Sequence, residues 1–90
     1  MGKSFEEMVC ASLNDALIKM VDDRLGSEVQ LVEIPFGGDI GRAIGFKNFL
    51  WEGYGVVYSS EVIARPCAGE GGNIDYNYFL SVRRRINASL

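Results

Sequence analysis

The feature that most restricts the fold is a regular apolar stripe in the segment Ser4–Leu25. Its apolar residues recur at steps of three and four, which places them on one face of an α-helix. Ser4 and Glu7 match the capping box that begins a helix, and Gly26 can take the left-handed conformation that ends one. The stripe consists of Phe5, Met8, Val9, Leu13, Ala16, Leu17, Met20, Val21 and Leu25. These side chains need a partner surface, which the rest of the chain should supply.

Several later stretches are rich in β-branched and aliphatic residues and predict strands. Residues 28–34 form the first, and Pro35 ends it or places it at an edge of the sheet. Residues 54–59 form another strand, which residues 61–65 continue or pair with. Pro66 is expected to stop this strand because proline cannot donate to the ladder of hydrogen bonds.

The stretch between these strands is rich in glycine and is harder to interpret. After a turn at residues 37–39, residues 40–46 predict a glycine-bearing strand. The alternative is a short helix capped by Asp39, in which each of two glycines would cost about 1 kcal/mol relative to alanine. Residues 48–52 fit either a helix or a strand, and Gly53 is expected to end the regular structure.

The terminal segment, residues 74–86, follows a glycine-rich loop at residues 68–73 that predicts a hairpin connection. Apolar and polar residues alternate strictly along the segment, with Phe79 as the apolar exception on the polar face. A period of two indicates a strand with one apolar face. A helical pattern also exists, but the aromatic and β-branched content favours the strand; that pattern runs through Tyr78, Phe79, Val82 and Ile86.

These elements predict a single α+β domain over residues 1–90. One N-terminal amphipathic helix packs on a mostly antiparallel sheet of four to five strands, because helix and sheet each have one apolar face to bury. Connections of hairpin length suit antiparallel pairing. No apolar run approaches the roughly 20 residues of a membrane span, and the N-terminal residues lack the apolar core of a signal peptide. We therefore expect a soluble protein without a membrane partner.

Cys10 and Cys67 are the two cysteines of the chain. A small secreted domain usually carries more cysteines than two, because it depends on several disulfides for its stability. We therefore expect both thiols to be reduced and the protein to be cytoplasmic.

The residue types needed for most catalytic sites are scarce. The chain has no histidine, which removes Ser-His-Asp and Cys-His machinery and the commonest zinc ligand. The glycine segment at residues 37–45 lacks the lysine of a Walker loop and the spacing of a dinucleotide-binding loop. Cys67 has no histidine to act as a base, so it is interpreted as an ordinary loop cysteine. We expect a protein that is not an enzyme and binds no cofactor or metal.

Carboxylates offer the one catalytic alternative. Glu33, Asp39 and Glu61 would have to approach one another across the sheet to hold a divalent cation, as in a small metal-dependent enzyme. Their spacing does not specify such a cluster.

Charge is uneven along the chain, and it supports a second alternative. Residues 1–39 hold eight acidic and three basic residues, a net charge of −5, and residues 40–90 hold four acidic and six basic residues, a net charge of +2. The run Arg83, Arg84 and Arg85, with Lys47, could contact phosphates in a nucleic-acid-binding protein. The chain is acidic overall, however, and three contiguous arginines are a small electrostatic footprint.

Aromatic residues supply the leading functional hypothesis. Ten of the ninety residues are aromatic, and exposed aromatic side chains mark surfaces that bind partners. A small sheet also has unpaired edges that can dock another strand or a second copy. We therefore expect a non-catalytic domain that binds a partner protein or itself, with a dimer as the favoured assembly. The expected contact residues are Phe49, Trp51, Tyr54, Arg83, Arg84 and Arg85.

Overall fold

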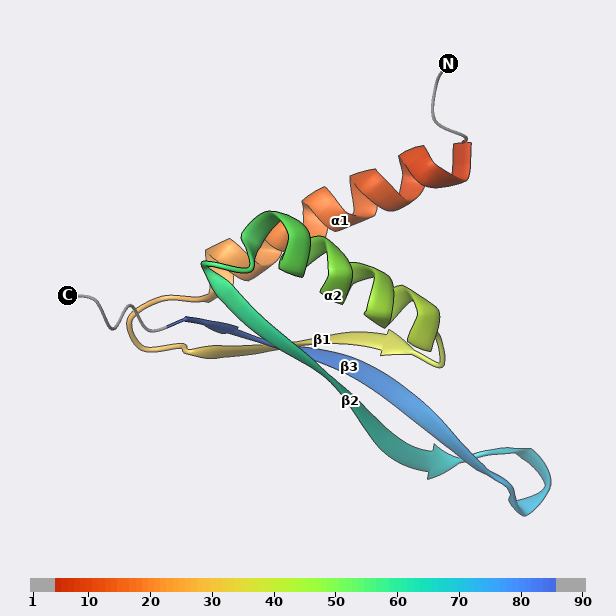
Figure 1. The fold of residues 1–90 in the computed structure, drawn as a ribbon. Coiled ribbons are helices and arrows are strands. Elements are labelled where there is room, and N and C mark those ends of the chain that lie inside the picture. Colours follow the sequence, from red (N-terminus) through yellow and green to blue (C-terminus); the bar gives the residue numbers. More distant parts are fainter. Residues whose placement is uncertain (1–4, 86–90) are drawn as a thin grey trace.

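A computed structural model gives the fold and describes residues 5–85, without the side chains of Glu6, Glu7 and Cys10. The described part is α+β, with two α-helices and one three-stranded antiparallel sheet (Figure 1). The predicted class is therefore confirmed, whereas the prediction of four to five strands is wrong. The elements in chain order are α1 (Phe5–Arg24), β1 (Leu31–Gly37), α2 (Ile40–Tyr54), β2 (Tyr58–Ala68), a 3₁₀ turn (Glu70–Gly72) and β3 (Ile74–Arg84).

The strands lie in the order β1–β3–β2, so the terminal segment of alternating residues is the central strand. β2 and β3 form a long hairpin that is paired from Tyr58 opposite Arg84 to Ala68 opposite Ile74. β1 pairs with the other side of β3, also antiparallel. The strand interpretation of residues 74–84 and the hairpin connection before it are confirmed. Ile86 lies outside the described residues.

The first strand is shifted relative to the prediction. β1 begins at Leu31 instead of residue 28 and continues through Pro35 to Gly37. Because β1 is an edge strand, the missing N–H of Pro35 is tolerated, as the sequence predicted for an edge position. Gly37 has a positive φ of 58° and turns the chain from β1 toward α2, a conformation that glycine adopts without strain.

Residues 40–46 are helical, so the prediction of a glycine-bearing strand is wrong. Asp39 caps the helix, because its Oδ1 accepts a hydrogen bond of 3.0 Å from the N–H of Arg42. The buried residues of α2 recur at steps of three and four and insert into the core; they are Ala43, Phe46 and Leu50. Burial of a large apolar side chain stabilises by about 1.5–3 kcal/mol, which outweighs the cost of about 1 kcal/mol for each helical glycine.

The same helix resolves the ambiguous stretch at residues 48–52. α2 continues through it and through Gly53, and ends at Tyr54. The strand predicted for residues 54–59 therefore begins only at Tyr58, after a turn in which Val57 N–H donates to Tyr54 C=O.

Pro66 does not stop β2, contrary to the prediction. Hydrogen bonds from Gly69 N–H to Asn73 C=O and from Arg85 N–H to Val57 C=O bracket the hairpin. Main-chain groups alternate sides along an antiparallel strand, so odd-numbered residues of β2 face β3 and even-numbered residues face the free edge. Pro66 is even-numbered, so its missing N–H removes no hydrogen bond to β3.

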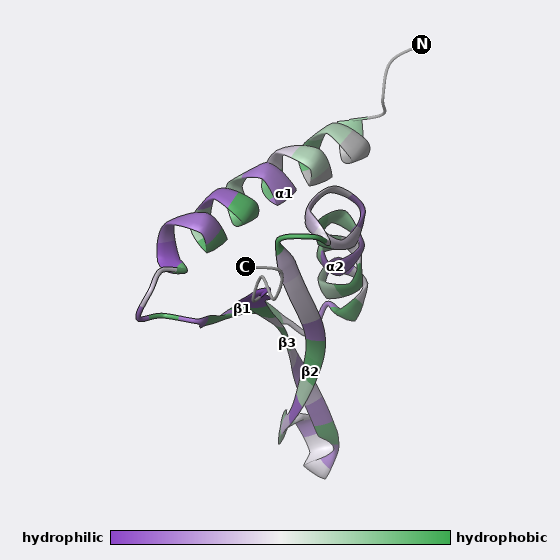
Figure 2. Ribbon diagram, turned by 60° about the vertical axis from the view of Figure 1, so that its left-hand side comes forward, coloured by the Kyte–Doolittle hydropathy of each residue, from purple (hydrophilic) through white to green (hydrophobic). Residues whose placement is uncertain are grey.

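The core lies between the sheet and the two helices, which share one face of the sheet (Figures 1 and 2). Helix α2 lies directly over the strands, and the C-terminal half of α1 packs beside it. The opposite face of the sheet has no helix over it. The buried core cluster consists of Ile18, Val21, Leu25, Val32, Ile34, Phe46, Leu50, Tyr58, Leu80 and Val82.

Helix α1 confirms the predicted helix but not its predicted packing. Only its C-terminal half contributes buried side chains, with Leu17 and Met20 packed against the core cluster. Its N-terminal half extends away from the sheet, and Phe5, Met8 and Leu13 are exposed there. The capping box falls outside the description, because Ser4 and the side chain of Glu7 are not described.

The molecule is more extended than a compact domain of its length. Its radius of gyration is 15.1 Å, whereas about 12 Å is typical of 90 residues. Its accessible surface is 6582 Å², whereas about 5200 Å² is typical of a monomer of 9.9 kDa. The N-terminal half of α1 and the distal half of the β2–β3 hairpin protrude from the packed centre (Figure 1). These protrusions offer surface that the domain itself does not cover.

Candidate interaction site

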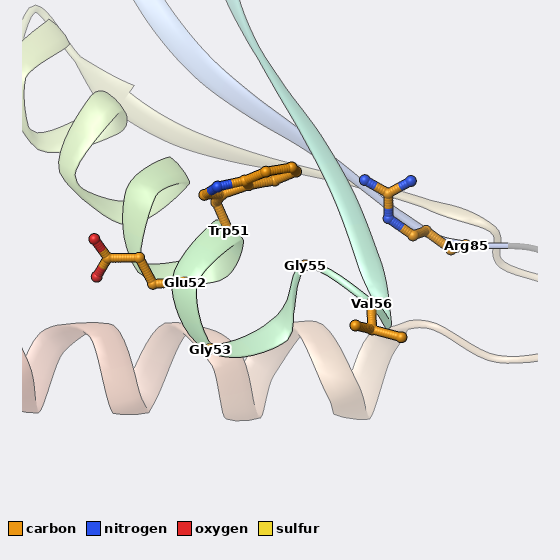
Figure 3. Close-up of a pocket in the computed structure, with 6 residues that line it drawn as sticks. All are labelled: Trp51, Glu52, Gly53, Gly55, Val56 and Arg85. Atoms are coloured by element: carbon orange, nitrogen blue, oxygen red, sulfur yellow. The ribbon is translucent and has the colours of Figure 1, made fainter.

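Two strongly exposed apolar side chains lie close together where α2 turns into β2. Trp51, on the last turns of α2, is 69% exposed, and Val56, in the following turn, is 90% exposed. Trp51 and Val56 line an open cavity of about 720 Å³ together with Glu52, Gly53, Gly55 and Arg85. In Figure 3 the indole of Trp51 and the guanidinium of Arg85 extend toward the space beside β2, whereas Glu52 points away from them.

A second hollow of about 370 Å³ adjoins the first, and Trp51 and Arg85 line both. It lies between the flank of α2 and the start of β2. We call the two hollows together the α2–β2 cleft. Its residues are Lys47, Asn48, Trp51, Glu52, Gly53, Gly55, Val56, Tyr58, Ser59, Ser60 and Arg85.

The helix geometry explains why Trp51 is exposed. Its neighbour Leu50 is buried with Phe46, and one residue along an α-helix turns the side chain by about 100°. Trp51 therefore projects from the flank of α2 instead of the core face. Gly55 sets the turn that follows, because a Cβ at this position would lie 2.6 Å from the carbonyl oxygen of Trp51.

A chain of aromatic rings supports the cleft from below. Phe36, Phe46, Phe49, Tyr54 and Tyr58 contact one another in succession, with ring centroids 5.6 to 6.5 Å apart. Such distances are typical of favourable aromatic pairs. Of these rings Tyr58 lines the cleft, and the others connect it to the core cluster.

The free edge of β2 forms one wall of the cleft. Even-numbered residues face this edge with their main-chain groups, and two of them, Tyr58 and Ser60, line the cleft itself. Within the described residues, the one strand paired with β2 is β3. The edge thus presents N–H and C=O groups next to an apolar hollow, a combination that suits an added strand or an inserted side chain.

The predicted contact residues divide between this cleft and the core. Trp51 and Arg85 line the cleft, as does Lys47 from the nucleic-acid alternative. Phe49 and Tyr54 instead pack against the core cluster and form part of the chain of aromatic rings.

The arginine run does not form one basic patch. Arg83 lies on the helix-free face of the sheet, in register with Leu31 of β1 and Ser59 of β2. Arg84 reaches back to α1, where its Nη2 donates a hydrogen bond of 3.4 Å to the carbonyl of Leu25. Only Arg85 faces the α2–β2 cleft. Alternation therefore separates Arg84 from the other two, whereas Arg83 and Arg85 line neighbouring hollows that share Ser59 and Ser60.

The carboxylates of the metal-site alternative have separate structural roles. Glu33 makes two hydrogen bonds to the guanidinium of Arg65, at 2.9 and 2.8 Å, across the central strand. This bond lowers the pKa of the Glu33 carboxyl and raises the pKa of Arg65. Arg65 also lies 4.7 Å from the ring centroid of Phe79 beneath it. Asp39 caps α2, and residues 5–85 contain no cluster of three potential metal ligands among the side chains described.

Cys67 is a free, half-buried thiol on β2, in the distal half of the hairpin. The side chain of Cys10 is not described, so the prediction that both thiols are reduced remains a prediction for Cys10. Among the described residues, no helix is long and apolar enough to cross a membrane.

A second apolar surface was not anticipated from the sequence. Phe5, Met8, Val9, Ser12 and Leu13 line a shallow hollow on the protruding half of α1. We call residues 5–16 the α1 arm. The sequence assigned its apolar residues to the core because they recur at helical steps, but steps of four turn the stripe around α1, so the arm residues point away from the side on which Ile18 and Val21 are buried.

Comparison with protein-family models, curated proteins and solved structures finds no match to this chain.

Proposed function

We propose that this protein is a non-catalytic binding domain that acts by protein–protein interaction, with the α2–β2 cleft as its contact site. The observation that carries the proposal is the exposure of Trp51 and Val56 beside the free edge of β2. Tryptophan is among the residue types that contribute most to protein interfaces, above all at the centre of a contact. Exposure of such an apolar side chain to water is unfavourable in free energy, and burial against a partner protein removes this penalty.

The composition of the cleft fits a protein partner. Trp51, Val56 and Tyr58 give it an apolar and aromatic part, and Lys47, Glu52 and Arg85 supply charged side chains beside them. An apolar centre with a polar rim is the usual organisation of protein interfaces. Arg85 alone of the arginine run faces this cleft, which favours contact with a protein over contact with a nucleic-acid backbone.

The test compares three single variants of the full chain. Trp51→Ser and Val56→Ser remove the exposed apolar side chains of the cleft, and Ile74→Ser removes a similarly exposed one, 67% accessible, from the hairpin. Self-association is measured by size exclusion with light scattering, and partner binding by quantitative capture on immobilised protein. We expect the wild type and Ile74→Ser to associate equally, and both cleft variants to lose association.

Two outcomes would contradict the proposal. One is a strict monomer that captures no protein in a manner dependent on Trp51. The other is tight binding of a random oligonucleotide that weakens steeply with salt, which would favour the alternative of phosphate contacts through Lys47 and Arg83–Arg85.

A further inference from the structure

The two segments that bear exposed apolar surfaces differ in the sign of their net charge. The α1 arm, residues 5–16, contains three acidic residues and no basic residue; the acidic residues are Glu6, Glu7 and Asp15. The α2–β2 cleft contains two basic residues, Lys47 and Arg85, and one acidic residue, Glu52. An arm–arm contact would bring acidic segments together, and a cleft–cleft contact would bring the basic side chains together. An arm in a cleft pairs unlike charges.

The arm cannot reach the cleft of its own chain. The cleft lies at the C-terminal ends of both helices, whereas the arm is the N-terminal half of α1 (Figure 1). About 24 Å of helix separates Val9 from Leu25, at 1.5 Å per residue. The two surfaces therefore belong to opposite ends of the molecule, and they can meet only between copies.

A partner would also stabilise the arm. The arm continues the packed half of α1 and needs no nucleation of its own, but most helical stability in proteins comes from packing of the apolar face. Phe5 is 79% exposed, Met8 55% and Leu13 47%, so the domain itself supplies none of that packing.

The surface area is sufficient for such an assembly. The chain exposes 6582 Å², which is about 1400 Å² more than a compact monomer of this mass. Stable interfaces bury about 1200–2000 Å² counted over both partners. In an assembly of copies each molecule contributes one arm and one cleft, so the area buried per molecule equals that of one whole interface.

From these observations, and resting on the proposed function, we infer that the partner of the α2–β2 cleft is the α1 arm of a second copy of this chain. The apolar stripe of the arm packs on Trp51 and Val56 in the cleft of the neighbouring molecule. Two copies that each place their arm in the cleft of the other close into a two-fold dimer, and a contact that is not reciprocal generates a larger ring or an open filament.

The experiment uses two full-length variants, each with one blocked surface. The arm variant carries Met8→Asp and Leu13→Asp, and the cleft variant carries Trp51→Ser and Val56→Asp. All four positions are exposed, so circular dichroism should give the wild-type spectrum for both. Masses are measured by size exclusion with light scattering over a range of protein concentrations. The wild type should form a dimer by exchange of arms or a larger assembly, and each variant alone should be a monomer.

Mixing the two variants is the decisive step. The arm variant retains an intact cleft and the cleft variant retains an intact arm, so a one-to-one mixture should form a heterodimer of twice the 9.9 kDa chain mass that cannot extend further. In the cleft variant, loss of Trp51 should weaken the binding of an arm roughly 30-fold or more, because an aromatic hot spot is removed. Ile74→Asp, on the exposed hairpin, is the matched control and should assemble as the wild type does.

The contradicting outcomes separate the alternatives. Self-association of the arm variant alone would indicate a contact between two clefts or two β2 edges, and self-association of the cleft variant alone would indicate a contact between two arms. A mixture that stays monomeric would exclude the arm as the occupant. If the wild type is itself monomeric but captures another protein through Trp51, this inference fails while the proposed function stands.

Discussion

The two helices differ in how much of their length the domain supports. α1 has the clearer sequence pattern, yet only its C-terminal half is packed, and its N-terminal half protrudes. α2 carries glycines and an irregular pattern, yet it lies over the sheet and buries Ala43, Phe46 and Leu50 along its length. A regular apolar stripe therefore indicates that a helix has a partner, but not whether the partner belongs to the same chain.

The largest expected effect comes from removing the same residue type from each helix. Phe46→Ala deletes a ring that is fully buried in the core cluster, and it should destabilise the fold by about 3–5 kcal/mol. Phe5→Ala deletes an exposed ring from the arm and should change the free energy of unfolding by no more than about 0.5 kcal/mol. Urea unfolding at a concentration where the protein is monomeric measures both. Equal losses for the two variants would show that the arm is packed within its own domain.

This difference also explains which features of the fold could be predicted from the sequence. Helix α1, the hairpin and the strand at residues 74–84 follow local rules of periodicity and turn composition, and they were predicted correctly. The exposure of the arm does have a signal in the sequence: the stripe advances mostly in steps of four, and each such step turns the side chain about 40° beyond a full helical turn, so Phe5 faces away from the side of α1 on which Val21 is buried.

The wrong predictions arose where tertiary context decides between local preferences. Residues 40–46 were assigned to a strand because of their glycines, although Asp39 was recognised as a potential helix cap. The decisive factor is burial of Phe46 and Leu50 against the sheet, which depends on residues distant in sequence. Pro66 was assigned as a strand end because proline lacks an N–H. A strand tolerates proline where that N–H would face a free edge, and which side of β2 is free depends on the order of strands in the sheet.

The candidate site was predicted in part for the same reason. Trp51, Lys47 and Arg85 share the cleft, whereas Phe49 and Tyr54 belong to the aromatic chain beneath it. Composition identifies aromatic residues as contact candidates, but it does not distinguish core rings from exposed ones. The spacing of Trp51 from the buried positions of α2 is the signal that separates them, and it becomes readable only once the segment is assigned to a helix.

The second prediction concerns the start of α2 and has an intermediate size. Asp39→Ala removes the side-chain acceptor of the Arg42 N–H and should lower the stability of the fold by about 1 kcal/mol. Asp39→Asn is the matched variant, because asparagine caps helices about as well as aspartate, and it should retain most of the stability. Thermal or urea unfolding compares the three proteins. Equal loss in both variants would mean that the carboxylate acts through its charge instead of its hydrogen bond.

The smallest effect is expected on the face of the sheet that neither helix covers. The bonds from Arg65 hold the pKa of Glu33 below its ordinary value of 4.5, so the folded state favours the ionised carboxylate. Its contribution to stability is therefore present above this ordinary value and is lost as the pH falls through the lower pKa of the folded state. The pair is exposed to solvent, which screens it and keeps the effect small.

Glu33→Gln should accordingly be less stable than the wild type near neutral pH, and the difference should close in acid. Urea unfolding of both proteins from pH 7 down to pH 3 measures this gap. The Arg65→Met background removes the cation that lowers the pKa, so there Glu33→Gln should lose its pH-dependent effect. A gap of constant size across the pH range would show that Arg65 does not stabilise the ionised form. Only the two helices would then show that covered and uncovered parts of the molecule differ in their contribution to stability.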